Sequence, residues 1–273
     1  MDPRAEEGAP MPTGSRCLSA PFDGGEIPVY AYRPARADGR DVALLFPGMR
    51  RNAAGLRDKA IALCEATGLV VYAPLLDAQR FPRWRYQHGG VARDGALRPP
   101  EEWTAPLLQG LVDWTWRQCA PYRPRLRLFG HSAGGQLLSR VCAYAPLDGV
   151  ERYVVSNPSS HVLPLHDESP PYGFAGIGDA AALRAYLGAR LTLYLGGNDT
   201  GGANLARGGA ARQGANRLER GRHAYQLARR VARELGMTLN WRLIEASGVG
   251  HSSREMLAAP ACRLALGLEA RAL

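Results

Sequence analysis

Residues 128–135 read LFGHSAGG, an apolar run followed by a serine between glycines. The apolar residues before the serine are typical of a buried strand, and the period of residues 133–144 predicts a helix. Ser132 therefore lies on a sharp turn between a strand and a helix, where Gly130 and Gly134 supply the small neighbours that such a turn needs. The turn either holds a serine nucleophile above the sheet or is an ordinary glycine-rich connection, and the rest of the chain decides between them.

The remaining sequence alternates between short apolar runs and segments with helical period. The predicted strands cover residues 27–32, 42–46, 69–72, 126–129, 153–155, 191–195 and 241–244. The predicted helices cover residues 53–66, 101–119, 133–144, 216–235 and 252–266. Nearly continuous apolar strands are expected in a parallel sheet that is covered by helices on both faces. We therefore predict an α/β fold with one doubly wound sheet.

Length and composition agree with a globular protein, since 46% of the 273 residues are hydrophobic and 22% are charged. Residues 1–14 lack the apolar stretch of a secretory signal, and we predict a disordered tail there, followed by a single domain over 15–273. No apolar run reaches the roughly 20 residues that a membrane span requires. The five cysteines are widely separated and have no metal-binding spacing. We expect a cytoplasmic protein with no metal, no cofactor and no membrane partner.

The net charge of +9 raises the question of nucleic-acid binding. Lys59 is the single lysine among 34 basic residues, and the arginines are scattered along the chain rather than gathered on one helix. This distribution does not match a nucleic-acid surface, so no nucleic-acid partner is expected. The charge is either a solvated surface or a field that attracts anionic substrates.

Three long irregular segments follow predicted strands, namely residues 77–100, 157–178 and 199–214. Long irregular stretches inside a compact domain are often functional. In an open α/β sheet, ligands bind beyond the carboxyl ends of the strands. We therefore expect these segments to converge on one edge of the sheet and to form the site there.

A serine hydroxyl is a weak nucleophile unless a neighbouring base accepts its proton. Among six histidines, His251 lies between the last predicted strand and the last predicted helix, at the edge where Ser132 is expected. Asp199 follows the strand at 191–195 and is suitably placed to orient the His251 imidazole and stabilise its charged form. The alternative for each residue is an ordinary place in a loop or turn. Taken together, the positions predict a catalytic Ser132, Asp199 and His251.

The oxyanion of an acyl-transfer reaction needs hydrogen-bond donors. One predicted donor is the N–H of Ala133, directly after the serine. The loop after residues 42–46 reads FPGMRRN, and Gly48 allows a tight turn that would aim the N–H of Met49 into the site. A plain Pro-Gly turn is the alternative interpretation of this loop.

With GHSAGG, FPGM, GGND and GVGHS in their respective places, residues 25–270 resemble the α/β-hydrolase superfamily. The family's order of nucleophile, acid and base matches Ser132, Asp199 and His251. The resemblance implies a mostly parallel eight-stranded sheet with an antiparallel strand at its start and no large lid domain. Within the family, the chain is similar to carboxylesterases, polyester depolymerase-like and feruloyl-esterase-like hydrolases. It departs from the family pattern at Pro47, where a histidine is usual before the glycine.

These features predict a cofactor-free serine hydrolase that cleaves a carboxylic ester through an acyl-enzyme, with polyesters and anionic esters or amides among the candidate substrates. A peptidase or amidase, an acyltransferase and a non-catalytic binding protein of the same fold are the alternatives. Aromatic side chains of the irregular segments either line a substrate pocket or pack the loops, and an arginine near the oxyanion loop either meets the substrate or faces solvent. The predicted substrate-binding residues are Trp84, Tyr86, Tyr172, Phe174 and Arg50.

Overall fold

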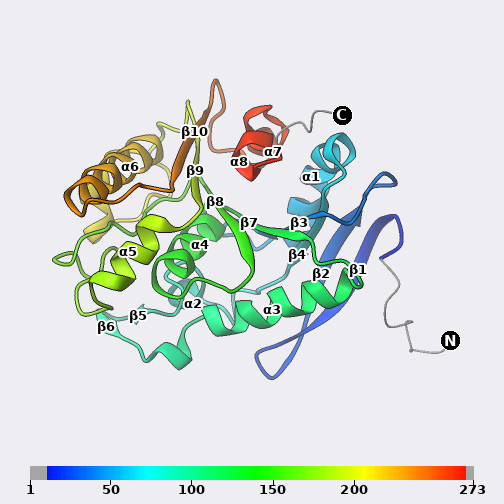
Figure 1. Cartoon of the computed structure of the whole chain (residues 1–273), viewed down its shortest axis with the longest axis horizontal. Coiled ribbons are helices and arrows are strands. Elements are labelled where there is room, and N and C mark those ends of the chain that lie inside the picture. Colours follow the sequence, from blue (N-terminus) through cyan, green and yellow to red (C-terminus); the bar gives the residue numbers. More distant parts are fainter. Residues whose placement is uncertain (1–10, 269–273) are drawn as a thin grey trace.

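The computed structural model describes residues 11–268, and its centre is an eight-stranded sheet with the order β1-β2-β4-β3-β7-β8-β9-β10 (Figure 1). The strands of this sheet are β1 (Gly14–Phe22), β2 (Gly25–Arg33), β3 (Asp41–Phe46), β4 (Val70–Pro74), β7 (Arg125–His131), β8 (Val150–Ser156), β9 (Leu191–Gly196) and β10 (Arg242–Ala246). The short strands β5 (Ala92–Arg93) and β6 (Ala96–Leu97) pair with each other. The helices are α1 (Ala53–Thr67), α2 (Arg83–Tyr86), α3 (Ala105–Gln118), α4 (Ala133–Tyr144), α5 (Ala180–Gly188), α6 (Arg217–Glu234), α7 (Ser253–Ala258) and α8 (Ala261–Leu266), with 3-10 turns at Pro100–Glu102 and Gly208–Gln213.

The sheet is mostly parallel. Strands β4, β3, β7, β8, β9 and β10 run in one direction, whereas β2 is antiparallel to both β1 and β4. The predicted doubly wound sheet and the antiparallel start are therefore confirmed. Because the six parallel strands share one direction, their carboxyl ends lie along one edge, which is where the loops that follow β3, β7, β8, β9 and β10 meet.

Helices cover both faces of the sheet, and alternate side chains of each central strand are buried against different helices. Along β3, Val42, Leu44 and Phe46 belong to the core that contains α3, α4, α5 and α6. Ala43 and Leu45 point the other way, into the core that contains α1, α7 and α8. Figure 1 shows the two groups of helices on opposite sides of the sheet. This two-sided burial explains why the strands are apolar at successive positions.

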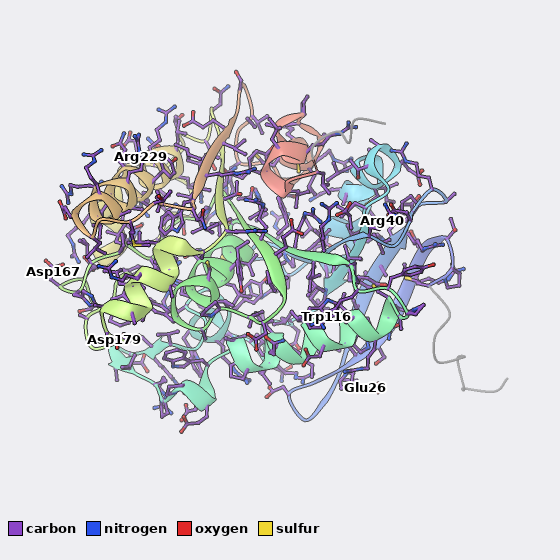
Figure 2. All side chains as sticks on the ribbon, viewed as in Figure 1. Glu26, Arg40, Trp116, Asp167, Asp179 and Arg229 are labelled. Atoms are coloured by element: carbon purple, nitrogen blue, oxygen red, sulfur yellow. The ribbon has the colours of Figure 1, made fainter. Side chains whose placement is uncertain are left out.

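Every strand predicted from an apolar run is present, and besides the short α2, β5 and β6 and the 3-10 turns, β1 and α5 were not predicted. Strand β1 is a sheet edge with mostly exposed side chains, so its sequence lacks a clear apolar pattern. Helix α5 is short, and Asp179 caps it by accepting hydrogen bonds from the N–H groups of Ala181 and Ala182 (Figure 2). The edge strand is defined by backbone pairing, which periodicity does not detect, and the apolar stripe of α5 is limited to Leu183, Tyr186 and Leu187.

Two predicted helices have different ends in the structure. The helix expected at 252–266 is divided into α7 and α8, because Pro260 cannot continue a helix from the preceding turn. The helix expected at 101–119 begins at Ala105, with Pro106 in its first turn, where proline is tolerated.

Part of the predicted tail at residues 1–14 is ordered in the structure. Its first ten residues lie outside the described part of the chain. Met11 is buried in the core and Gly14 begins β1, so the end of the predicted tail belongs to the fold. Within residues 11–268, no helix combines the length and the hydropathy that crossing a bilayer would require.

Candidate active site

Ser132 lies on a strained turn between β7 and α4, as the sequence predicts. Its backbone has φ 56° and ψ −111°, a conformation that is unfavourable for a residue with a side chain. A Cβ at Gly130 would lie 2.3 Å from the carbonyl oxygen of Gly134, and a Cβ at Gly134 would lie 2.1 Å from the carbonyl oxygen of Phe46. The flanking glycines are therefore required by backbone-to-backbone contacts, which supports a nucleophile elbow rather than a flexible loop.

Hydrogen bonds to the backbone fix the turn around Ser132. The Ser132 N–H donates to the carbonyl oxygen of Ser156 at the end of β8 (2.8 Å), and the Gln136 N–H donates to the Ser132 carbonyl oxygen (3.0 Å). Ala133 is the first residue of α4, so its N–H has no partner within the helix. That N–H is available to a ligand beside the Ser132 hydroxyl.

The structure brings Ser132, His251 and Asp199 together in one hydrogen-bonded chain. The Ser132 hydroxyl is 3.1 Å from Nε2 of His251, and Nδ1 of His251 is 2.7 Å from Oδ2 of Asp199. With the proton on Nδ1, the imidazole donates to the carboxylate and accepts from the hydroxyl. This arrangement can activate a serine oxygen and stabilise the positive charge that the imidazole then carries.

Asp199 is almost completely buried, with 2% of its surface exposed. Its Oδ1 is 3.5 Å from Nη1 of Arg217, which is itself buried in the first turn of α6. Burial lowers the pKa of the Arg217 guanidinium, and the Asp199 charge opposes that change. Arg217 therefore provides the counter-charge of a buried carboxylate.

Asn157 connects three of the loops that form the site, and sequence analysis did not single it out. Its Oδ1 accepts a hydrogen bond from the N–H of Gly196 at the end of β9 (2.7 Å), and its Nδ2 donates to the carbonyl oxygen of Gly250 (3.3 Å). Gly250 directly precedes His251, so Asn157 positions the histidine loop against the sheet. Its own φ of 46° is one that asparagine tolerates better than most residues.

His131 lies beside the catalytic candidate His251 without joining its chain of hydrogen bonds. The two ring centroids are 5.0 Å apart, and Nδ1 of His131 is hydrogen-bonded to the Ser156 hydroxyl at 3.1 Å. Burial lowers the pKa of His131 to about 3, so this imidazole is neutral at physiological pH. A neutral ring can pack against His251 without opposing the charge that His251 would acquire.

The loop after β3 passes directly beside Ser132. A Cβ placed on Gly48 would lie 3.5 Å from Cβ of Ser132, so the backbone that leads to Met49 borders the nucleophile candidate. Tyr86 supports this loop, because its hydroxyl donates to the Pro47 carbonyl oxygen (2.7 Å) and its ring lies 3.5 Å from the Arg51 guanidinium. The loop is thus held by side-chain contacts, as an oxyanion-binding loop should be.

The predicted substrate-binding residues are only partly suited to that role. Tyr86 and Phe174 are fully buried, so they cannot contact a substrate, and this part of the prediction is wrong. Phe174, within the irregular segment 157–178, packs in the core against the rings of Tyr144 and Tyr186. Trp84 and Tyr172 are half-buried, and Arg50 is exposed next to Met49. These three remain candidates for substrate contact.

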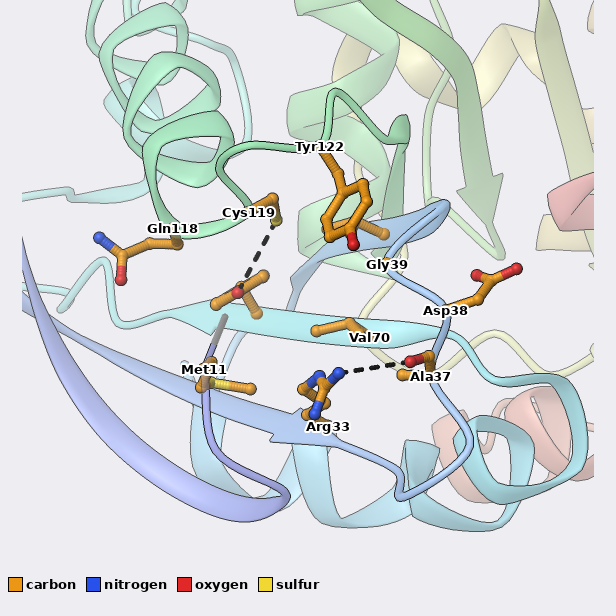
Figure 3. A pocket seen from close by; sticks show the side chains of 11 residues that line it. Met11, Arg33, Ala37, Asp38, Gly39, Val70, Gln118, Cys119 and Tyr122 are labelled. Carbon is orange, nitrogen blue, oxygen red and sulfur yellow. Dashed lines mark hydrogen bonds between the residues drawn. The ribbon is translucent and has the colours of Figure 1, made fainter. Parts of the chain in front are cut away.

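A pocket of about 200 Å³ lies elsewhere in the fold, as Figure 3 shows. It is lined by Val42 and Val70, near the amino ends of β3 and β4, and by Cys119 and Tyr122. Ser132 follows the carboxyl end of β7, so this pocket lies at the opposite edge of the sheet and does not belong to the site. Within residues 11–268, no group of three or more His, Cys, Asp or Glu side chains is placed to hold a metal ion.

Solved structures of other proteins resemble this chain over nearly its whole length. Poly(aspartic acid) hydrolase-1 from Sphingomonas sp. KT-1 is 29% identical, with a TM-score of 0.84 over 94% of this chain and 99% of that chain. LpqC, a poly(3-hydroxybutyrate) depolymerase from Bordetella parapertussis, is 27% identical, with a TM-score of 0.84 over 95% of this chain and 93% of that chain. An esterase from Pyrobaculum calidifontis, at 14% identity and a TM-score of 0.54 over 95% of this chain and 87% of that chain, shares the fold. No protein-family model matches the chain, and no curated protein sequence matches it.

Proposed function

We propose that this chain, an α/β-hydrolase of the serine hydrolase type, cleaves carboxylic esters with Ser132 as nucleophile, His251 as general base and Asp199 as the orienting carboxylate. The observation that carries the proposal is the continuous chain of hydrogen bonds from the Ser132 hydroxyl through His251 to Asp199. Similar proteins of the same fold act on polymers, which bears on the substrate discussed below.

In the first step, Oγ of Ser132 attacks the carbonyl carbon of the ester while Nε2 of His251 takes the hydroxyl proton. The carbonyl π electrons move to the oxygen, which becomes an oxyanion. The N–H of Ala133, directly after Ser132, and the N–H of Met49, directly after the Gly48 that lies beside Ser132, are the donors to that oxygen in this proposal. His251 becomes positively charged, and the buried Asp199 carboxylate stabilises that charge.

In the second step, the tetrahedral intermediate collapses and the bond to the leaving alcohol breaks. His251 gives its proton to the departing oxygen, so the alcohol leaves neutral and an acyl-Ser132 ester remains. A water molecule then loses a proton to His251 and attacks the acyl carbon. Return of that proton to Oγ of Ser132 releases the carboxylic acid and restores the enzyme.

For the substrate, we propose an oligomeric or polymeric acyl chain. Two proteins support this choice, because the poly(aspartic acid) hydrolase and the poly(3-hydroxybutyrate) depolymerase are both similar to the chain from end to end. The first of them is named for a polyamide, so cleavage of an amide is the second candidate reaction. The chemistry at Ser132 is the same for both, and a neutral amine rather than an alcohol would then leave.

We place the reaction in the cytoplasm. All five cysteines are free thiols, and four of them are buried, as is usual in a reducing compartment. Burial raises the pKa of the Cys64 and Cys262 thiols to about 12, so these side chains are unreactive core residues.

Labelling with a fluorophosphonate probe tests the proposal directly. We expect the purified protein to be labelled at Ser132 and the Ser132→Ala variant to remain unlabelled and to lose hydrolysis of p-nitrophenyl butyrate by at least about a thousandfold. An unlabelled, inactive wild-type protein would identify a binding protein of this fold instead. A panel of short and long acyl esters, poly(3-hydroxybutyrate) and poly(aspartic acid), with and without an alcohol acceptor, then separates esterase, amidase and acyltransferase activity.

A further inference from the structure

A second cavity, of about 540 Å³, lies between α2, the irregular segment 199–214 and the first turn of α6. Three of its lining residues are arginines, namely Arg83, Arg207 and Arg220. The other lining residues are small or neutral, and none of the residues that line the cavity is an aspartate or a glutamate. The cavity is therefore strongly positive, because no acidic side chain in its walls compensates the three arginines.

Arg220 forms the buried part of this cavity. Its guanidinium donates to the carbonyl oxygens of Gly214 (2.9 Å), Ala206 (2.9 Å) and Ser159. These partners engage Nε and Nη1 of Arg220, and none of them carries a charge. Burial lowers the pKa of Arg220, and the nearby Arg217 charge lowers it further. A buried cation whose protein partners are neutral leaves room for an anion.

The two exposed arginines of the cavity differ from the surface arginines that are paired with carboxylates. The guanidinium groups of Arg83 and Arg207 have no hydrogen bond or ion pair to the described residues. By contrast, Arg212 is 2.7 Å from a carboxylate oxygen of Glu168, and Arg222 on α6 is paired with a carboxylate in the same way. The side chains at the cavity are thus available to an external group.

The direction of α6 adds to the positive field. Arg217 and Arg220 both lie in the first turn of this 18-residue helix, where the helix dipole is already positive. Arginine is unfavourable at such a position unless a negative charge is nearby. Asp199 supplies that charge for Arg217 at 3.5 Å, whereas within the described part of the chain Arg220 has only carbonyl partners.

The cavity belongs to the same edge of the sheet as the catalytic candidates. Ser159, which accepts a hydrogen bond from Arg220, follows the end of β8 by three residues. Segment 199–214 begins with Asp199, and the Asp199 carbonyl oxygen accepts from the N–H of Leu218, in the first turn of α6. A chain-like substrate bound at Ser132 can therefore continue toward the arginines.

We propose that the cavity lined by Arg83, Arg207 and Arg220 is a subsite for carboxylate groups of the substrate, away from the bond that Ser132 cleaves. The inference rests on the proposed function for the reaction, and it names the substrate class as a polycarboxylate ester or amide. Guanidinium groups bind carboxylates through paired, charge-assisted hydrogen bonds, so more than one arginine can hold successive carboxylates of such a chain.

Binding by the inactive Ser132→Ala protein tests the subsite apart from catalysis. The probe is a fluorescein-labelled octamer of aspartate, followed by fluorescence anisotropy, with a serine octamer as the neutral comparison. We expect the aspartate octamer to bind and the serine octamer not to bind. Adding Arg83→Gln and Arg207→Gln should weaken binding by at least about tenfold, which corresponds to about 1.4 kcal/mol.

The matched control is Arg229→Gln, which removes the same charge from an exposed position of α6, far along the helix from the cavity (Figure 2). This control should bind the aspartate octamer like its parent. If Arg83→Gln/Arg207→Gln and Arg229→Gln bind equally well, the proposed subsite is refuted. Displacement of the octamer by inorganic phosphate at equimolar concentration would identify a site for free small anions and would also overturn the assignment.

A kinetic measurement with the active enzyme separates the two proposals. The ratio of kcat/KM for an anionic oligomeric ester to that for p-nitrophenyl butyrate should fall at least about tenfold in Arg83→Gln/Arg207→Gln. An unchanged ratio would contradict the subsite while leaving the hydrolase intact. Absence of all turnover, with octamer binding retained, would contradict the proposed reaction and leave the subsite standing.

Discussion

Replacing Gly134 by alanine should disturb catalysis through a backbone contact beneath the nucleophile. Gly134 is the second residue of α4, directly beneath Ser132, and its Cα faces the end of β3. An added Cβ would lie 2.1 Å from the Phe46 carbonyl oxygen, whereas ordinary contacts begin at 3.4 Å. The helix must therefore move away from the strand by about 1.3 Å (3.4 − 2.1), because neither atom belongs to a flexible side chain.

This displacement is large on the scale of the site. The Ser132 hydroxyl is 3.1 Å from Nε2 of His251, and full transmission of the movement would lengthen that distance to about 4.4 Å (3.1 + 1.3). A misplacement of about 1 Å can reduce a rate by about a hundredfold. Overpacking of a well-packed region also costs about 1–3 kcal/mol of stability. We therefore expect Gly134→Ala to lose about a hundredfold in kcat/KM and to unfold at a lower temperature.

Steady-state hydrolysis of p-nitrophenyl butyrate and thermal unfolding followed by circular dichroism measure the two effects. The chain provides a matched control in Gly110→Ala, which places the same methyl group in α3 where no atom lies within 4 Å. Because alanine is favoured over glycine in a helix, this control should keep full activity and gain about 0.5–1 kcal/mol of stability.

The reasoning is refuted if Gly134→Ala keeps its kcat/KM within about threefold of the wild type. It is also refuted if both alanine variants lose activity alike, because the loss would then come from any added methyl group. Loss of stability without loss of kcat/KM would indicate that the helix moves without carrying Ser132.

Three further outcomes are expected. Asn157→Ala removes the bridge to the His251 loop, so steady-state kinetics should show kcat/KM about tenfold lower with KM nearly unchanged. An unchanged kcat would contradict the positioning role of Asn157. Arg217→Met leaves the Asp199 carboxylate buried without its cation, so urea denaturation should show a loss of about 3 kcal/mol in the free energy of unfolding. Because burial lowers the pKa of His131 from 6.5 to about 3, the unfolded chain binds a proton in that interval that the folded chain does not. Stability should therefore fall as the pH decreases from 6.5 to 3, and less steeply in His131→Gln, as urea midpoints across that range will test.

The fold was largely predictable because its central strands are buried on both faces. Residues 42–46, for example, are apolar at every position, and the structure places them alternately in the two cores. The edge strand β1 was missed since only part of one face is covered, and its residues are mostly polar or exposed. Hydrophobic periodicity detects burial, so it fails where an element is defined by backbone pairing at an edge.

The triad candidates were predictable from position, whereas the residues that hold them were not. Ser132, Asp199 and His251 each follow a strand, and that regularity can be read from one sequence. Arg217 lies within a run of arginines on a helix, so its sequence does not distinguish it from its solvated neighbours. Only the packing of α6 against the loop after β9 places its guanidinium 3.5 Å from the Asp199 carboxylate.

Backbone strain at the carboxyl edge of the sheet explains why these supporting contacts are needed. Ser132, Asn157 and Arg51 all have positive φ, at 56°, 46° and 54°, and none of them is a glycine. Such conformations cost roughly 1–3 kcal/mol each and persist only where neighbouring contacts enforce them. The Ser156 carbonyl holds Ser132, the bonds to β9 and the histidine loop hold Asn157, and stacking on Tyr86 holds Arg51. Loss of any one support should therefore relax the loop it holds and displace the catalytic groups, even where the variant remains folded.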